Sequence, residues 1–340
     1  MKAGFFHISL RVPVFFPGRL TGERTYNMKI YRAGIDIGGT SVKGGLFGPE
    51  GQLIRKWSFP TDRSDNGSRI LPDTASSIRQ IFRQTGLDLK DLAGIGVGVP
   101  GAVTDHQTVN RCVNLGWGAL PAGPLLSRLM DGIPVRIAND ANAAALGESW
   151  AGSGRDFDSL VMVTIGTGIG AGLIQGGRIV EGAFGAAGEI GHLLVNEEEQ
   201  LPCSCGGKGH LEQYASASGL AAQAEKLLAS SDTPSLLRRA EHLDAEAVYK
   251  AAGLGDPLAL KLTDQEARML GLALSYVSCV FDPGIFLIGG GLSLAGDVLL
   301  EGIRRYYRKY AFHASRDTAF ALAKLGPDAG IYGVARLIQI

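Results

Sequence analysis

Four cysteine and histidine residues in the second half of the chain have the spacing of a metal site. They form the pattern H-x10-C-x-C-x4-H, and they are His192, Cys203, Cys205 and His210. Two sulfur ligands and two imidazole nitrogens make a tetrahedral set for Zn2+. In a reducing compartment, a Cys-x-Cys pair before a glycine-rich turn is more often metal-binding than redox-active. The spacing therefore predicts a bound Zn2+.

Carboxylates bracket this segment. Glu189 lies three residues before His192, and Glu212 lies two residues after His210. Carboxylates that converge beside an ordered loop suit a polyhydroxylated ligand, because its hydroxyl groups need acceptors. We interpret the acidic run Glu197 to Glu199, between the two histidines, as a solvated loop that contributes no ligand.

Glycine-rich turns elsewhere in the chain predict phosphate binding. DIGGT, at Asp36 to Thr40, follows a strand-like run; its glycines allow backbone N–H groups to approach a phosphate, and its carboxylate can hold hydrated Mg2+. TIGTGIGAG, at Thr164 to Gly172, repeats this chemistry, and LIGGGLS, at Leu287 to Ser293, offers a flat surface to an adenine ring. The sequence matches neither a P-loop nor a dinucleotide-binding fingerprint. Two turns facing each other across a cleft are a different kind of phosphate clamp.

Asp140 is a candidate general base. It follows Asn139 at the junction between strand-like residues 133–137 and an alanine-rich helix. The positive end of a helix dipole favours a carboxylate, and an ionised carboxylate in a cleft can accept a proton from a substrate hydroxyl. The alternative is that Asp140 is only a second capping acid beside Asn139.

Length and composition set the frame in which these residues must be positioned. A chain of 340 residues favours two compact domains, since single cores stop growing at roughly 250–300 residues. With 45% hydrophobic and 19% charged residues, the chain is not disordered. The 33 basic residues balance the 33 acidic ones, so charge gives no reason to expect nucleic acid or a membrane as partner. Four cysteines are too few for a disulfide scaffold, so we expect a cytoplasmic location.

An internal repeat indicates two related halves. Residues 30–54 have the pattern of a hairpin around DIGGT, and residues 159–180 have the same plan. Shifted by 128 positions, Asp36 falls on Thr164, and glycine and apolar positions align around them. The alternative is two independent glycine-rich hairpins. The fold class is α/β in two lobes, with a hinge near residue 139.

Ordinary α/β units connect these segments. Asp73 is expected to cap a helix that ends near Gly86. An Asp-Pro pair and later glycines interrupt the apolar stretch 271–296, which we interpret as a buried helix, a turn and a strand rather than a membrane span. Cys112 and Cys279 stand in apolar surroundings, and we expect both in the core.

Eight segments together resemble the ROK family of sugar kinases and sugar-responsive repressors. In chain order they are AGIDIGGTSVKGGLFG, GVGVPGAV, VNLGW, NDANAAALGE, VTIGTGIGAG, GEIGH, CSCGGKGHLEQYAS and LIGGGLS. The match runs from about residue 30 to the C-terminus, and the combination is specific although each loop is not. The resemblance implies the actin-like ATPase fold, in which two ribonuclease-H-like lobes enclose a cleft.

The resemblance also implies domains and site residues. The expected domains are an extension of unknown role (1–28), a small lobe (29–139), a large lobe with the zinc-type loop (140–325) and a C-terminal helix packing back on the small lobe (326–340). ATP and Mg2+ would be held by Asp36, Gly38, Gly39, Thr40, Lys43, Thr164, Gly166, Thr167, Gly168, Gly289, Gly290 and Gly291. The sugar would be held by Gly101, Asn114, Asn139, Asp140, Glu189, His192 and Glu212, with Asp140 as the base.

One position departs from the family pattern. The family usually has a third cysteine where this chain has His210. Histidine is itself a zinc ligand, so a Cys2His2 set retains structural Zn2+, but the longer imidazole must shift the loop. A shifted loop would affect Glu212 and the sugar-facing side of His192 first.

The predicted reaction is ATP-dependent phosphorylation of a hexose, most simply at the 6-hydroxyl of glucose, because EQYAS resembles bacterial glucokinases. N-acetylmannosamine, N-acetylglucosamine, fructose and allose are alternative substrates, and polyphosphate is an alternative donor. The family implies a homodimer. A transcriptional regulator without its DNA-binding domain is a remote alternative, since about 30 residues precede the DIGGT strand and they include Pro13, Pro17 and Gly18.

Overall fold

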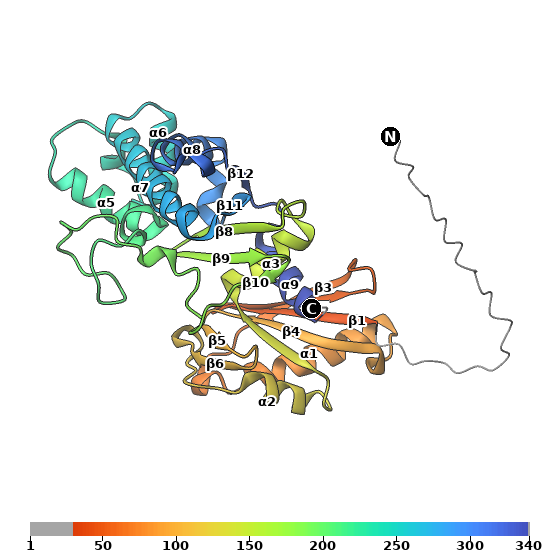
Figure 1. Ribbon diagram of the computed structural model, residues 1–340. Coiled ribbons are helices and arrows are strands. Elements are labelled where there is room, and N and C mark those ends of the chain that lie inside the picture. The colour runs from red at the N-terminus through yellow and green to blue at the C-terminus, as the bar shows by residue number, and fades with distance from the viewer. Residues whose placement is uncertain (1–29, 339–340) are drawn as a thin grey trace, which may run out of the picture.

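Two five-stranded sheets organise residues 30–338, the part of the chain described by this computed structural model (Figure 1). The first sheet consists of β1 (Tyr31–Ile37), β2 (Ser41–Phe47), β3 (Leu53–Pro60), β4 (Leu92–Val99) and β7 (Val135–Asn139). The second consists of β8 (Ser159–Ile165), β9 (Ile169–Gln175), β10 (Arg178–Ile179), β11 (Ile285–Gly289) and β12 (Ala319–Leu322). Their strand orders are β3-β2-β1-β4-β7 and β10-β9-β8-β11-β12.

The two sheets share one plan. In the first, β1 pairs antiparallel with β2 and parallel with β4; in the second, β8 pairs antiparallel with β9 and parallel with β11. The β1–β2 hairpin spans residues 31–47 and the β8–β9 hairpin spans residues 159–175, an offset of 128 positions at both ends. The predicted internal repeat is therefore confirmed, and each repeat forms the sheet of one lobe.

The small lobe packs α1 (Ile70–Thr85) and α2 (Ala122–Leu129) against its sheet. The apolar face of α1 is buried, and Gly86 ends the helix in a left-handed conformation at φ 70°, as predicted. The expectation that Asp73 caps α1 is wrong, because the helix begins before it. Asp73 lies in the first turn, where its carboxylate accepts a hydrogen bond from the Arg69 guanidinium at 2.9 Å.

The large lobe adds a layer of helices to its sheet (Figure 1). These are α4 (Glu212–Ala215), α5 (Ala217–Ala229), α6 (Ala245–Gly253), α7 (Pro257–Phe281) and α8 (Asp297–Tyr310). The apolar stretch 271–296 is a helix, a turn and a strand, as predicted. Cys112 is buried as expected, but Cys279 is exposed and its placement in the core is wrong. It lies in the last turn of α7 beside the exposed Val280, on a face that turns away from the core.

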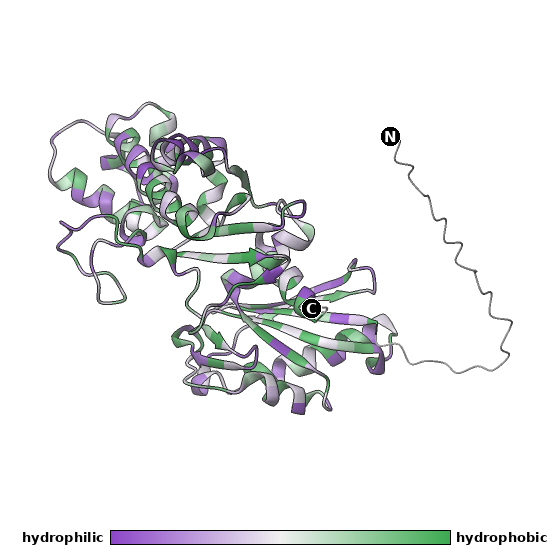
Figure 2. Cartoon of the chain, viewed as in Figure 1, coloured by the Kyte–Doolittle hydropathy of each residue, from purple (hydrophilic) through white to green (hydrophobic). Residues whose placement is uncertain are grey.

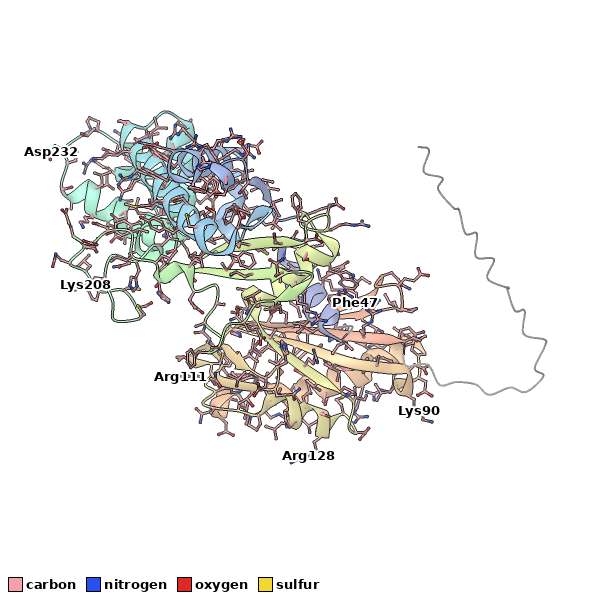
Figure 3. The ribbon with its side chains drawn as sticks, in the orientation of Figure 1. Phe47, Lys90, Arg111, Arg128, Lys208 and Asp232 are labelled. Carbon is pink, nitrogen blue, oxygen red and sulfur yellow. The ribbon has the colours of Figure 1, made fainter. Side chains whose placement is uncertain are left out.

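Two helices cross between the lobes (Figure 1). The first, α3 (Asp140–Ala151), packs on the second sheet, and α9 (Ala329–Leu337) packs on the first. Their backbones approach closely because glycine lies at the crossing: a Cβ at Gly333 would lie 1.7 Å from the carbonyl oxygen of Ala143. Phe47 of β2 packs against α9 at this junction (Figure 3).

The remaining features are peripheral to the two sheets. A short ladder of β5 (Ala102–Thr104) and β6 (Thr108–Arg111) lies within the small lobe, outside its five-stranded sheet. Hydrophobic residues follow the strands and the helix faces that pack on them (Figure 2).

Among residues 30–338, no helix is both long enough and apolar enough to cross a membrane. The predicted extension 1–28 and the last two residues of the predicted segment 326–340 lie outside the described residues.

Candidate active site

A cleft of about 860 Å³ lies between the two lobes and receives both glycine turns. Most of the predicted site residues line it: Asp36, Gly38, Lys43, Gly101, Asn139, Asp140, Thr164, Gly166, Thr167, Gly168, Glu189, His192, Glu212, Gly289, Gly290 and Gly291. Gly39, Thr40 and Asn114 are not among its lining residues. Gly39 instead faces the backbone of Asn114: a Cβ added at Gly39 would lie 3.9 Å from the Asn114 carbonyl oxygen. Residues far apart in the sequence thus meet at one cleft.

Asp36 is the charged residue of the small-lobe turn. It is paired across the hairpin with Lys43, so a cation and a carboxylate enter the cleft side by side. Burial raises the pKa of Asp36 to about 6, and the negative charge of Asp140 adds to this effect while Lys43 opposes it. The carboxylate therefore lies where a divalent cation would relieve an unfavourable charge.

Asp140 lies at the first position of α3. The helix is capped by Asn139, whose Oδ1 accepts the N–H groups of Ala141 and Asn142 at 2.9 and 3.2 Å. Asn139 Nδ2 donates to the Gly101 carbonyl at 3.3 Å, so the Asn139 amide has backbone partners at both ends. Asn139 therefore caps α3, while the Asp140 carboxylate shares only the Ala141 N–H with it and lines the cleft.

The proton affinity of Asp140 is raised. Its Oδ1 accepts the N–H of Ala141 at 2.8 Å, which favours the ionised form. Burial among the walls of the cleft outweighs this bond and raises the pKa of Asp140, and the negative charge of Glu189 acts in the same direction. A carboxylate with a raised pKa at a helix N-terminus is suited to receive a proton.

The large-lobe turn, at Thr164 to Gly172, carries no charge and is held by internal hydrogen bonds. Gly166 donates its N–H to the Gly168 carbonyl at 3.0 Å, and the Thr164 hydroxyl donates to the Gly170 carbonyl at 3.2 Å. A Cβ at Gly166 would meet no atom within 4 Å, so this turn presents open backbone to the cleft. At the third glycine cluster, Gly290 has φ 82°, and it lets the end of β11 lie against β8.

The predicted metal ligands converge. The ligand atoms of all four lie within 4.8 Å of one another: His192, Cys203, Cys205 and His210. Cys203 Sγ lies 3.9 Å from His192 Nδ1, and Cys205 Sγ lies 3.2 Å from His210 Nδ1. Tetrahedral zinc places its sulfur and nitrogen ligands about 3.5 Å apart. The donor set and its spacing therefore fit Zn2+, with His210 in the position of the usual cysteine.

His192 and Glu212 connect this cluster to the cleft. While His192 Nδ1 faces Cys203, its Nε2 lies 3.9 Å from Glu189 Oε2 on the cleft side. Glu212 Oε1 accepts a hydrogen bond from Cys203 Sγ at 3.0 Å, and its Oε2 approaches Gly168, 3.2 Å from a Cβ built there. Glu189, His192, Glu212 and Gly168 thus line the cleft together, and Cys203, which does not line it, contacts His192 and Glu212.

Two features escaped the sequence reasoning. The segment 326–330 lines the cleft, where the Pro327 carbonyl accepts a hydrogen bond from Lys43 Nζ at 3.3 Å. Its glycines and proline signal a turn, but the sequence does not show that this turn lies in the cleft beside Lys43. The interpretation of residues 197–199 as a solvated loop is wrong for Glu199, which is buried because protein donors replace its solvent.

The sequence profile of the ROK family matches residues 32–340. The chain belongs to the ROK family. It is 37% identical over 311 residues to a glucokinase of Halalkalibacterium halodurans, covering 90% of this chain and 94% of that protein. It is 32% identical to an N-acetylmannosamine kinase of Escherichia fergusonii, covering 90% of this chain and 97% of that protein.

The fold is also shared with solved ROK structures. A ROK family glucokinase of Streptomyces griseus, in complex with glucose and AMPPNP, superposes with a TM-score of 0.71 at 32% identity. The match covers 90% of this chain and 98% of that one. The predicted actin-like ATPase fold of two ribonuclease-H-like lobes is confirmed by this similarity and by the two matching sheets.

Proposed function

We propose that this ROK-family chain is an ATP-dependent hexose kinase that transfers the γ-phosphate to the 6-hydroxyl of glucose, with Asp140 as the general base. The observation that carries the proposal is the place of Asp140, between two glycine turns on one side and Glu189 and His192 on the other, in one cleft. Similarity to relatives named glucokinase and N-acetylmannosamine kinase supports a sugar as the acceptor.

The sugar end of the cleft offers hydrogen-bond acceptors. Glu189, Glu212 and the Nε2 side of His192 would bind ring hydroxyls, and Gly101 and Asn139 line the same cleft. The predicted contact of Asn114 requires lobe closure, because this residue is exposed beside the cleft. With the ring held there, the attacking hydroxyl would lie beside Asp140.

The nucleotide end offers backbone donors and charge. The glycine turns and Lys43 would hold the phosphates, and residues 289–291 would lie against the adenosine. Asp36 would hold hydrated Mg2+, which neutralises phosphate charge when it is bound. Phosphoryl transfer has a loose transition state, so positioning provides most of the catalysis, and Asp140 receives the hydroxyl proton late.

Zinc is proposed as a structural ion. The four converging ligands would hold it, and it would fix His192 through Nδ1 so that Nε2 faces the sugar. Binding requires loss of the thiol proton that Cys203 now donates to Glu212, so that Glu212 Oε1 would keep only its hydrogen bond from the Ser204 hydroxyl. The zinc content of the purified protein, measured by atomic emission, tests this assignment.

The test of function is a coupled ADP-release assay with Mg2+ and ATP against glucose, fructose, allose, N-acetylmannosamine and N-acetylglucosamine, with polyphosphate as a second donor. We expect glucose and ATP to be preferred. Asp140→Asn should lower kcat by about 10³-fold, since general-base catalysis contributes 10²–10⁴-fold, while glucose binding measured by calorimetry is retained.

Asp105→Asn is the matched control, because Asp105 is an exposed carboxylate in the small lobe with no place in the cleft lining. Its turnover should equal that of the wild type. Near-wild-type turnover of Asp140→Asn would remove Asp140 from the mechanism, and preference for an N-acetylated sugar would replace glucose as the substrate.

A further inference from the structure

Glu199 differs from its two acidic neighbours. Its side chain is 4% exposed, whereas Glu197 and Glu198 are exposed, and their carboxylates make no hydrogen bond or ion pair within residues 30–338. A buried carboxylate must find hydrogen-bond donors or lose several kcal/mol of solvation. The contacts of Glu199 therefore show what its burial achieves.

The Glu199 carboxylate has donors from three parts of the large lobe. Its Oε1 accepts the N–H groups of Gln200 and Leu201 at 3.0 and 3.1 Å. Its Oε2 accepts the Tyr214 hydroxyl at 2.6 Å and lies 3.7 Å from Lys226 Nζ. The Tyr214 bond is the largest of the effects that lower the pKa of Glu199, so the group is an anion with charge-assisted bonds at neutral pH.

These donors connect the loop to the helix that carries Glu212. Tyr214 lies on α4 two residues after Glu212, and its hydroxyl also accepts a hydrogen bond from Asn196 Nδ2 at 2.8 Å. Lys226 lies on α5, which follows α4. A single carboxylate therefore joins the loop to two helices behind it.

The position of this anchor along the chain matters. Ten residues separate His192 from Cys203, and Glu199 lies within that span, four residues before Cys203. Pinning a loop in its middle reduces the conformational freedom that its ends lose when they meet. The part of the loop after Cys203 carries Lys208, which lies at the edge of the large lobe (Figure 3) and makes no hydrogen bond or ion pair with Glu199 in the described part of the chain.

We infer that Glu199 is a positioning residue for the metal loop, residues 192–210. It holds the loop on α4 and α5, so that Cys203 stays beside His192 and Glu212 keeps its place at the sugar end. Glu199 touches neither sugar nor metal and acts through these residues. The inference rests on the proposed sugar kinase function and on the proposed zinc ion, and its consequences are tighter zinc binding and tighter glucose binding.

The experiment compares Glu199→Gln with Glu198→Gln, an identical substitution at an exposed neighbour. Zinc affinity is measured by competition with a chromophoric chelator, and KM is measured for glucose and for ATP. We expect Glu199→Gln to weaken zinc binding by about tenfold or more, since loss of residues that support metal ligands typically costs 10–100-fold in affinity. The KM for glucose should rise several-fold, the KM for ATP should be unchanged, and Glu198→Gln should match the wild type.

Tyr214→Phe provides a second, milder variant that removes one hydroxyl and no charge. It should shift zinc affinity and glucose KM in the same direction by a smaller factor. Glu199→Gln/Tyr214→Phe should lose less than the sum of the two single variants, because both substitutions weaken the same Glu199–Tyr214 hydrogen bond.

The inference is overturned if Glu199→Gln and Tyr214→Phe both bind zinc and glucose as Glu198→Gln does, or if the KM for ATP rises as much as that for glucose. Failure of the proposed function can be distinguished from failure of this inference. If the wild type phosphorylates no sugar, the zinc competition still decides the role of Glu199, and if it binds no zinc, the KM for glucose decides it.

Discussion

The two lobes have the same strand plan but different chemistry at the same position. At an offset of 128 residues, the small-lobe hairpin carries Asp36 where the large-lobe hairpin carries Thr164, and both residues line the cleft. The small-lobe turn carries the Asp36 carboxylate, whose pKa is raised to about 6, and the large-lobe turn offers a hydroxyl and open backbone. A repeated scaffold therefore places a charged group on one side of the cleft and neutral hydrogen-bonding groups on the other; under the proposed function the two turns would divide the binding of the phosphates.

The central strands of the two sheets also differ in how they pack against the helices that cross between the lobes. In the small lobe, Gly34 of β1 is paired with Gly96 of β4, and the backbone of α9 lies directly on them. At the equivalent place in the large lobe, Met162 of β8 is paired with Leu287 of β11, and α3 packs on their side chains. The small lobe thus holds its helix through close backbone contact, and the large lobe through an apolar layer.

The largest effect should come from removing the charge that distinguishes the two turns. Asp36→Asn is expected to lower kcat by roughly 10²–10³-fold, the range found when one stabilising group is removed from a preorganised site. The loss should be accompanied by a higher Mg2+ requirement, because the carboxylate that would hold the hydrated ion is gone. Initial rates across a Mg2+ titration measure both. Turnover and Mg2+ dependence equal to those of the wild type would show that the charge of the small-lobe turn is not used.

The next effect concerns stability and tests the contrast between the helix contacts. Gly96→Ala places a Cβ 1.8 Å from the Val334 carbonyl oxygen, so α9 must move away from the sheet. We expect a loss of about 3 kcal/mol in the free energy of unfolding, at the upper end of overpacking costs. Gly166→Ala, in the open large-lobe turn, is the control and should be nearly neutral. Urea unfolding of both variants measures this, and equal stabilities would contradict the contrast.

The repeat also shows what the sequence could and could not predict. Local chemistry was sufficient for the hairpins, for the Asn139 cap and for the convergence of the four cysteine and histidine side chains, because glycine turns, helix caps and Cys/His spacing are set by residues close together in the sequence. The return of the C-terminal helix to the small lobe was expected from the resemblance, but the place of residues 326–330 in the cleft was not, because it depends on a contact with Lys43 far away in the sequence. Glu199 was misread for the same reason: its donors Tyr214 and Lys226 lie far along the chain.

A smaller effect is expected on the neutral side of the clamp. Thr164→Ala removes the hydroxyl that donates to the Gly170 carbonyl and loosens the large-lobe turn, without removing a charge. We expect the KM for ATP to rise by about tenfold or less, the equivalent of one hydrogen bond of about 1 kcal/mol, with little change in kcat. Steady-state kinetics at saturating glucose measure this. A loss as large as that of Asp36→Asn would mean that the two turns do not divide the task.

The last effect is a gain in stability that depends on pH. The pKa of Asp36 is raised from 3.8 to about 6, so ionisation of this group destabilises the folded state; the penalty is absent below about pH 4 and complete above about pH 6. Asp36→Asn removes that penalty and should raise the free energy of unfolding at pH 8 by about 1–2 kcal/mol, less than the full shift because the side chain keeps some contact with water. Below pH 4 the variant and the wild type should be equally stable. Thr164→Ala removes no titratable group, so its stability difference from the wild type should be the same at both pH values. Urea unfolding without Mg2+ at the two pH values measures this, and a pH-independent difference for Asp36→Asn would show that the small-lobe turn carries its charge at no cost to the fold.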